Sequence, residues 1–184
     1  MFNSLSAIEK YVTHNTLELL HLYIKKILHW NRTTNITSKN NTKTRLYNFI
    51  CEAIAIAELL NHNYTLNIAD VGSGNGFPGL VLNILGFKNC SLIEINSKKA
   101  AFLQYTVAEL NLSAKIFNLD VKDLRLQNTD VITSKAVMNS MDLKRLCKTI
   151  QNEKTRYILC KNGNERVVLK DKNNYEQTYS FENL

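Results

Sequence analysis

Apolar residues in the first third of the chain recur at about the period of an α-helix. Between residues 8 and 30 they alternate with lysines and other polar residues, a pattern that predicts one or two amphipathic helices. Residues 31–43 are polar, cationic and rich in side chains that cap helices, so they predict a loop. A second apolar pattern predicts a further helix over residues 44–60, and together these elements predict a helical cap over residues 1–62.

The pattern changes after residue 62, where short apolar runs alternate with helical ones. Such alternation predicts βαβ units and a parallel sheet. The clearest helix covers residues 97–110, with Ser97 as its N-cap. We therefore expect an α/β fold, a doubly wound, Rossmann-like sheet over residues 63–184 that forms one structural unit with the cap. The expected strands cover residues 66–71, 91–95, 115–119, 130–133 and 156–160.

The composition is that of a globular protein. The chain has 184 residues, of which 45% are hydrophobic and 21% charged, and this excludes a disordered or fibrous chain. The N-terminus resembles neither a secretory signal nor a membrane span, so we expect a cytoplasmic protein with no membrane partner. The net charge of +7 suits a polyanion such as nucleic acid, but proteins that bind none can carry it too.

The cysteines give no sign of a metal site or a disulfide. They lie far apart, form no CxxC pair and have no histidine at ligand spacing, so no metal is expected and a reducing compartment fits. Two of them lie within or beside apolar runs, where a free cysteine acts as a small buried apolar side chain. The four cysteines are Cys51, Cys90, Cys147 and Cys160, and the two beside apolar runs are Cys90 and Cys160.

Four of the six glycines lie in one segment, 70-DVGSGNGFPG-79, after the first predicted strand. Glycines let the backbone approach a ligand closely, and the first N–H groups of a following helix are unpaired. The segment predicts a nucleotide-binding loop, although a tight strand-to-helix turn without a ligand needs small residues too. Phe77 stands where the dinucleotide fingerprint GxGxxG needs glycine, which disfavours NAD. The residues expected at the ligand are Asp70, Gly72, Ser73, Gly74, Gly76 and Phe77.

Two further acids follow later strands of the predicted sheet. Glu94 lies at the end of the second strand, where its carboxylate can accept hydrogen bonds from both hydroxyls of a ribose. Asp120 ends the third strand, where an acceptor can meet the exocyclic amine of an adenine. Each acid alone could be a solvated residue at a strand end, but together with Asp70 and the glycine loop they favour an adenosine-type ligand.

The chain resembles the bacterial GidB (RsmG) family in the order and spacing of four segments. These are 30-WNRTTNITS-38, 70-DVGSGNGFPGL-80, 92-LIEINSKKAAFLQ-104 and 132-ITSKAV-137. The resemblance covers residues 23–163 and implies a class I S-adenosylmethionine methyltransferase fold with that cofactor. It also implies methylation of a guanine N7 in 16S ribosomal RNA, with this RNA or the small ribosomal subunit as partner. A monomer is the default expectation.

The resemblance assigns roles to individual residues. The methionine and ribose end of the cofactor would lie against Gly72 and Phe77, and Glu94 would hold the ribose. Val121 and Lys122 would border the adenine. Because guanine N7 already carries a lone pair, methyl transfer needs no general base, and alignment alone can lower the barrier by several kcal/mol. No catalytic acid or base is therefore assigned.

The chain departs from the family pattern near the expected substrate site. Lys135 stands where the family has an arginine near the cofactor carboxylate and the substrate, which keeps the charge but loses the planar fork. On the helix over residues 44–60, the family's Arg-His and Asp-Ser pairs are replaced by Asn48-Phe49 and Glu52-Ala53. A polar cluster is therefore either lost or rebuilt.

Two more departures lie near the C-terminus. Lys161 and Gly163 resemble a family Lys-Gly pair at the end of a later strand, but Asn162 separates them. The chain ends at Leu184, before there is room for the antiparallel hairpin with which the family's sheet usually ends. We therefore expect this C-terminal hairpin to be shortened.

Basic residues are the candidates for RNA contact, since contacts to phosphates supply affinity without sequence information. One cluster follows the first helical segment, and a single lysine follows the fifth strand. A second cluster on a later helix either binds RNA or is a solvated helix face. The first group comprises Arg32, Lys39, Lys43, Arg45 and Lys161, and the second comprises Lys144, Arg145 and Lys148.

Two other functions remain open. A non-catalytic relative, inactivated by the changes at Asn48, Phe49 and Lys135, would bind RNA without transferring a methyl group. A methyltransferase of a protein or a small molecule would bind the cofactor and ignore ribosomal RNA. Methyl transfer to small ribosomal subunits separates both from the first hypothesis.

Overall fold

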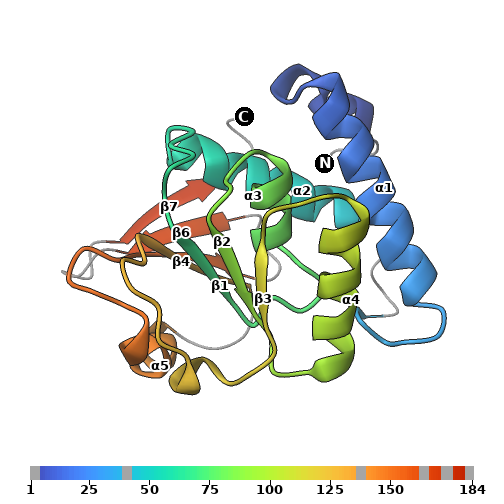
Figure 1. The fold of residues 1–184 in the computed structure, drawn as a ribbon. Helices are drawn as coiled ribbons and strands as arrows, with labels where there is room; N and C mark the ends of the chain where they lie inside the picture. The colour runs from blue at the N-terminus through green and yellow to red at the C-terminus, as the bar shows by residue number, and fades with distance from the viewer. Residues whose placement is uncertain (1–4, 39–42, 136–139, 162–165, 171–175, 181–184) are drawn as a thin grey trace.

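The computed structural model describes residues 5–38, 43–135, 140–161, 166–170 and 176–180. Two N-terminal helices precede an α/β domain in which strands and helices alternate (Figure 1). The helical elements are η1 (Leu5–Tyr11), α1 (His14–Trp30), α2 (Lys43–Leu59), α3 (Gly79–Ile84), α4 (Ser97–Glu109), η2 (Val121–Asp123), α5 (Ser140–Leu146) and η3 (Cys147–Thr149). The strands are β1 (Ile68–Val71), β2 (Cys90–Ile93), β3 (Lys115–Phe117), β4 (Val131–Lys135), β5 (Arg156–Lys161), β6 (Arg166–Lys170) and β7 (Glu176–Ser180).

The strands form one seven-stranded sheet in the order β3-β2-β1-β4-β5-β6-β7. The first five strands are parallel, as predicted, and the strand order reverses beside β1. Ligands of open α/β sheets bind outside the carboxyl ends of the strands at such a reversal. The expected edge for a site is therefore the one at which β1, β2 and β4 end.

The expectation of a shortened C-terminal hairpin is wrong. Strand β6 pairs antiparallel with β5 over five residue pairs, and β7 pairs antiparallel with β6 over five more. Strand β6 begins five positions after the last residue of β5, and β7 ends at Ser180, so both strands fit within the 184 residues. The sequence estimate had left no room for them.

Helices cover the two faces of the sheet unequally. Helices α1 to α4 lie over one face, whereas among the described residues only α5 and the short turns η2 and η3 cover the other (Figure 1). Side chains alternate accordingly along the buried strands. Ile68 and Leu92 belong to the first core, and their neighbours Ala69 and Ile93 belong to the second.

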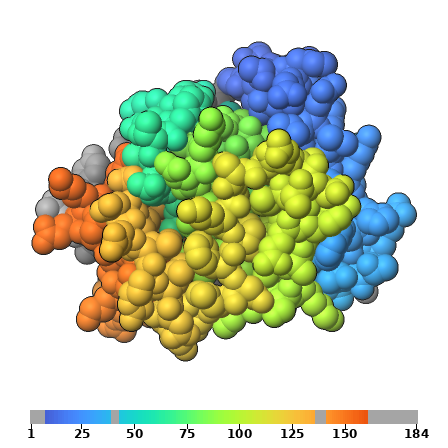
Figure 2. Space-filling model, viewed as in Figure 1, coloured from blue at the N-terminus to red at the C-terminus, as the bar shows by residue number. Residues whose placement is uncertain are grey.

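The N-terminal helices share one hydrophobic core with the sheet domain. Trp30, the last residue of α1, packs edge-on against Phe102 of α4, with ring centroids 5.5 Å apart. Lys26 and Glu109 form an ion pair of 3.3 Å between the same two helices. In the space-filling view, α1 lies directly against α4 (Figure 2), so the cap is fixed to the body by packing as well as by charge.

The predicted helices and strands are present, with ends that shift by a few residues. The predicted N-cap of α4 is wrong, because Asn96 and not Ser97 caps this helix. The Asn96 side chain accepts hydrogen bonds from the N–H groups of Lys98 and Lys99, at 3.1 and 3.2 Å.

All four cysteines are buried free thiols, as expected for Cys90 and Cys160. Among the described residues, no helix is long and apolar enough to span a membrane.

Candidate active site at the carboxyl edge of the sheet

Asp70 is a buried carboxylate in β1, with 1% of its surface exposed. Its side chain accepts hydrogen bonds from the Thr133 hydroxyl at 2.9 Å and from the Gly79 N–H at 3.2 Å. A Cβ atom at Gly79 would lie only 2.6 Å from the Asp70 Cβ. Asp70 therefore ties β1 to β4 and to the start of α3, and it supports the glycine loop from inside the protein.

Burial is the main cause that raises the pKa of Asp70, to about 6, while its hydrogen bonds act in the opposite direction. Since this folded-state pKa lies above the unfolded value, the folded chain binds the proton more tightly. Protonation of Asp70 should therefore add about 1 kcal/mol of stability between pH 7 and pH 5. We expect Asp70→Asn to lack this gain, which denaturant titrations of both proteins at the two pH values would measure. Equal pH dependence in the two proteins would contradict the raised pKa.

The glycine loop requires backbone conformations that other residues adopt rarely. Gly72, Gly74 and Gly76 have φ angles of 72°, 58° and 101°. A Cβ atom at Gly76 would lie 2.7 Å from the Tyr23 hydroxyl oxygen. The loop thus packs tightly against α1 on one side.

Tyr23 holds the glycine loop from the helical cap. Its buried hydroxyl donates a hydrogen bond of 2.6 Å to the carbonyl oxygen of Asn75. Burial, and then the charge of Asp70, raises the pKa of Tyr23 well above its usual value, so the hydroxyl stays protonated. Its ring also contacts Phe77, at 5.3 Å between centroids. A residue that the periodicity predicted only as core therefore supports the candidate site.

Tyr23→Phe should weaken binding of S-adenosylmethionine by about tenfold, because the Asn75 carbonyl loses a buried partner while the ring contacts remain. Calorimetric titration would measure the dissociation constant. Tyr105→Phe on the exposed side of α4 is the matched control. Equal affinities of the Tyr23 and Tyr105 variants would show that the hydroxyl does not position the loop.

Glu94 follows β2 and is 6% exposed. One carboxylate oxygen accepts a hydrogen bond from the Gly74 N–H and the other from the Asn96 N–H, both at 2.7 Å. Each oxygen retains a further lone pair for a ligand hydroxyl. The next residue, Ile95, is 67% exposed, so an apolar side chain is open to solvent just after β2.

Asp120 does not end a strand, because β3 already stops at Phe117. Its side chain instead caps η2 by accepting a hydrogen bond of 3.1 Å from the Lys122 N–H, and the Lys122 ammonium lies 3.1 Å from the other oxygen. These contacts lower the pKa of Asp120, with the backbone hydrogen bond as the largest cause. Val121 beside it is buried. The prediction that Asp120 ends the third strand is therefore wrong, and its partner in the fold is Lys122.

The polar cluster beside the expected substrate site is rebuilt. The ammonium group of Lys135, at the end of β4, forms an ion pair with Glu52 of α2. The side chains are only 11% and 12% exposed, and the same ammonium lies 3.8 Å from the centroid of the Phe49 ring. Three positions at which the sequence departs from the family pattern thus contact one another.

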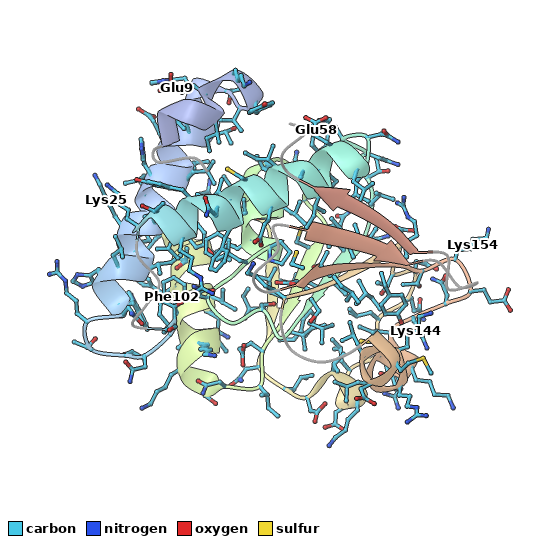
Figure 3. The ribbon with its side chains drawn as sticks, turned by 180° about the vertical axis from the view of Figure 1, so that it is seen from behind. Glu9, Lys25, Glu58, Phe102, Lys144 and Lys154 are labelled. Carbon is cyan, nitrogen blue, oxygen red and sulfur yellow. The ribbon has the colours of Figure 1, made fainter. Side chains whose placement is uncertain are left out.

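The predicted RNA-contacting residues lie in different parts of the fold. Arg32, Lys43 and Arg45 are exposed around the α1–α2 connection and the start of α2. Arg45 also lies 5.8 Å from the Phe49 ring, next to the cluster of Lys135. Lys39 and the Lys161 side chain lie outside the described residues. The second basic cluster is separate, since Lys144 lies on α5 (Figure 3).

Sequence reasoning missed Tyr23, Asn75 and Ile95 as residues of the site, and it named Glu52 as a departure from the family pattern without identifying its partner. Tyr23 and Glu52 lie far along the chain from their partners, and only a tertiary structure pairs them. Ile95 and Asn75 belong to the motif segments but have no distinctive residue type. Among the described residues, the buried Nδ2 atom of Asn75 has no hydrogen-bond partner, so the glycine loop holds one unused donor.

The sheet order, the glycine loop after β1 and the acid after β2 define a class I S-adenosylmethionine-dependent methyltransferase fold. Solved structures agree. A mutant of MtNAS in complex with S-adenosylmethionine has a TM-score of 0.54 at 18% identity, over 84% of this chain and 60% of that chain. Magnesium protoporphyrin IX methyltransferase from Synechocystis, with bound SAH, has a TM-score of 0.50 at 13% identity, over 79% of this chain and 71% of that chain.

The chain belongs to the GidB family, rRNA small subunit methyltransferase G, whose model matches residues 16–183. It is 32% identical over 178 residues to ribosomal RNA small subunit methyltransferase G from Campylobacter jejuni, covering 96% of this chain and 93% of the relative. It is 31% identical over 169 residues to the protein of that name from Orientia tsutsugamushi, covering 89% and 84%. The family resemblance predicted from the sequence motifs is confirmed.

Proposed function

We propose that this protein transfers a methyl group from S-adenosylmethionine to N7 of a guanine in 16S ribosomal RNA. Membership of the rRNA small subunit methyltransferase G family carries the proposal. The reaction takes place in the cytoplasm, on the RNA or on the small ribosomal subunit, with the protein acting as a monomer. The arrangement of Asp70, the glycine loop and Glu94 supports the choice of cofactor.

The residues at the carboxyl edge fit this cofactor. The free lone pairs of Glu94 would accept hydrogen bonds from the ribose hydroxyls, and the unpartnered Nδ2 atom of Asn75 would donate one to a polar group. Gly72, Ser73, Gly74, Gly76 and Phe77 would surround the methionine and ribose end, and Asp120, Val121 and Lys122 the adenine. The exposed side chain of Ile95 is a further apolar contact at the adenine end.

The cofactor supplies the electrophile, a methyl group on a positively charged sulfur. The lone pair of guanine N7 is the nucleophile, so no residue has to remove a proton before the transfer. The protein's part is to hold the two reactants in line and to exclude water, which lowers the barrier through proximity and fixed dipoles. Lys135 is held in place by Glu52 and Phe49, and it contacts the substrate or the cofactor carboxylate from this fixed position.

RNA is bound by basic side chains on the side of the α1–α2 connection. Arg32, Lys43 and Arg45 lie there, near the cluster of Lys135 and Phe49. Lys39 and Lys161 are further candidates for RNA contact from the sequence. Phosphates close to the reacting guanine would occupy this surface, so that binding depends on salt.

Arg32→Ala combined with Lys43→Ala should weaken binding to small-subunit RNA and reduce the slope of log affinity against log salt by about 1.5, because two phosphate contacts are lost. Filter binding at several salt concentrations measures both quantities. Lys10→Ala with Lys25→Ala removes the same charge from η1 and α1, outside the α1–α2 connection, and should change the slope less. A binding constant that does not depend on salt would contradict the assignment.

Transfer of labelled methyl groups tests the proposed function. Small ribosomal subunits from cells that lack this modification are incubated with the protein and labelled S-adenosylmethionine, alongside total cell protein and a small-molecule extract. Label is expected in the subunit RNA only. Label in protein or small molecules, with none in the RNA, would refute the proposed substrate, and bound cofactor without any transfer would identify a non-catalytic relative.

A further inference from the structure

The ion pair of Lys135 with Glu52 lies beside the glycine loop, on the side away from Glu94. Asp70 of β1 is in register with Thr133 of β4, so Lys135, two residues further along, is level with the start of the loop. Helix α2 brings Glu52 to it over the face of the sheet that α1 and α3 also cover (Figure 1). The pair is thus on the β4 side of β1, whereas Glu94 is on the β2 side.

One aromatic ring connects the pair to the glycine loop. Phe49 lies about one helical turn before Glu52 on α2, and the Lys135 ammonium is 3.8 Å from the centroid of its ring. The same ring packs against Phe77, with 5.3 Å between the two centroids. Both rings are buried. Packing therefore links the pair to a residue proposed to surround the methionine end of the cofactor, where the base to be methylated has to approach.

The charges of the pair suit a neutral base better than the carboxylate of the cofactor. The Lys135 ammonium already has one carboxylate beside it, and a second one there would repel the first. The pair has no net charge, so it does not oppose the positive charge that a base acquires when it is methylated, as an isolated lysine would. Of the two partners proposed for Lys135, the substrate base is therefore the better fit.

The two groups also match one edge of guanine. A carboxylate has about four lone-pair positions and an ammonium three N–H donors, so each can bind a further group while the two stay paired. Guanine presents the acceptor O6 beside the donors N1–H and N2–H, whereas adenine presents a donor at position 6 beside the acceptor N1. Adenine could meet both groups only if it were turned over, which would move its N7 away from the methyl group.

We propose that Glu52 and Lys135 select guanine as the base to be methylated. The Glu52 carboxylate accepts hydrogen bonds from N1–H and N2–H, and the Lys135 ammonium donates one to O6. This inference rests on the proposed function and identifies the residues that recognise its substrate. The side chains are 11% and 12% exposed, so these contacts form in a site with little water, where they are stronger than in solution.

The same contacts favour the transition state. As the bond from the methyl carbon to N7 forms, its bond to sulfur breaks, the sulfur keeps the bonding electrons and the base becomes a cation. The N1–H and N2–H groups of that cation are stronger donors than those of neutral guanine. Their hydrogen bonds to Glu52 therefore strengthen as the reaction proceeds, which lowers the barrier.

The test combines variants of the full chain with a change of the target base. Glu52→Gln removes the charge with little change of shape, and Glu58→Gln is the matched control, because Glu58 is an exposed acid of the same helix that pairs with His62. Glu52→Leu with Lys135→Met leaves no uncompensated charge inside, so it replaces Glu52→Gln if that variant does not fold. The methylated position is first located, and small subunits are then reconstituted with RNA that carries inosine only there. Inosine lacks the 2-amino group of guanosine but keeps O6, N1–H and N7.

The rate of a single turnover is measured at saturating cofactor. The unchanged protein should methylate guanine at least about tenfold faster than inosine, because inosine leaves Glu52 without one of its donors. Glu52→Gln should slow transfer to guanine at least about tenfold, and its preference for guanine over inosine should fall to about threefold or less. Glu58→Gln should keep the rate and the full preference. Inosine N7 is itself a weaker nucleophile, so the change of preference between the variants is the decisive quantity.

The affinity of Glu52→Gln for S-adenosylmethionine should stay within about twofold of the unchanged protein, since the ribose and the methionine end have other partners. A variant that is slower but keeps the full preference for guanine overturns the inference, because a purely structural role of Glu52 has that effect. Equal rates with guanine and inosine in the unchanged protein also overturn it, while the proposed function stands. If the unchanged protein methylates neither subunit, the proposed function fails and the inference falls with it.

Discussion

Glu94→Ala is expected to lower the affinity for S-adenosylmethionine by at least about 100-fold. The substitution removes the proposed acceptor of two ribose hydrogen bonds, and hydrogen bonds to a charged group contribute about 1.5–3 kcal/mol each. It also leaves the N–H groups of Gly74 and Asn96 without their partner, so the glycine loop loses a support. Both effects weaken binding in the same direction.

Calorimetric titration of the cofactor measures this effect. Glu153→Ala is the matched control, because Glu153 is exposed in the turn before β5 and far from the glycine loop in sequence. Glu94→Gln separates the two effects, since its amide oxygen can still accept one of the N–H groups. Unchanged affinity in Glu94→Ala would show that the ribose binds elsewhere.

Glu52→Ala should destabilise the fold by about 3 kcal/mol, because it leaves the ammonium of Lys135 nearly buried without a counter-charge. The Phe49 ring remains as a weaker partner. For a chain of this length the loss corresponds to a fall of about 6–12 °C in melting temperature. Thermal unfolding followed by circular dichroism measures it.

A double-mutant cycle isolates the ion pair from other effects of the substitution. Glu52→Leu with Lys135→Met removes both charges and should cost less stability than Glu52→Leu alone, since no uncompensated charge is left inside. If the losses of the two single variants simply add in the double variant, the two side chains do not stabilise each other. The rebuilt cluster would then be without energetic consequence.

Much of the fold could be read from local patterns. The five parallel strands have short apolar runs, and each is preceded or followed by a segment of helical period. Their positions along the chain and their parallel pairing therefore follow from the sequence. The terminal hairpin was missed because strands β6 and β7 are only five residues each and need fewer residues than expected. The N-cap of α4 was missed because Asn96 and Ser97 are adjacent and both residue types cap helices well.

The site was only partly predictable, for a different reason. Asp70, the glycines and Glu94 lie in short motifs, and the topology brings their segments together at one edge. The contacts of Tyr23 with Asn75 and of Glu52 with Lys135 join residues 52 and 83 positions apart. No local sequence pattern predicts such contacts, because they form only when the helical cap packs on the sheet.

The amount of 7-methylguanosine in 16S ribosomal RNA is the most direct test of the account. The gene for this chain, or for its Glu94→Ala variant, is expressed in cells whose own enzyme for this modification has been deleted, and the purified RNA is digested to nucleosides. The account predicts that the unchanged chain restores 7-methylguanosine and that the variant, present at an equal level, does not. RNA that stays unmethylated in cells containing the folded, cofactor-binding protein would contradict it.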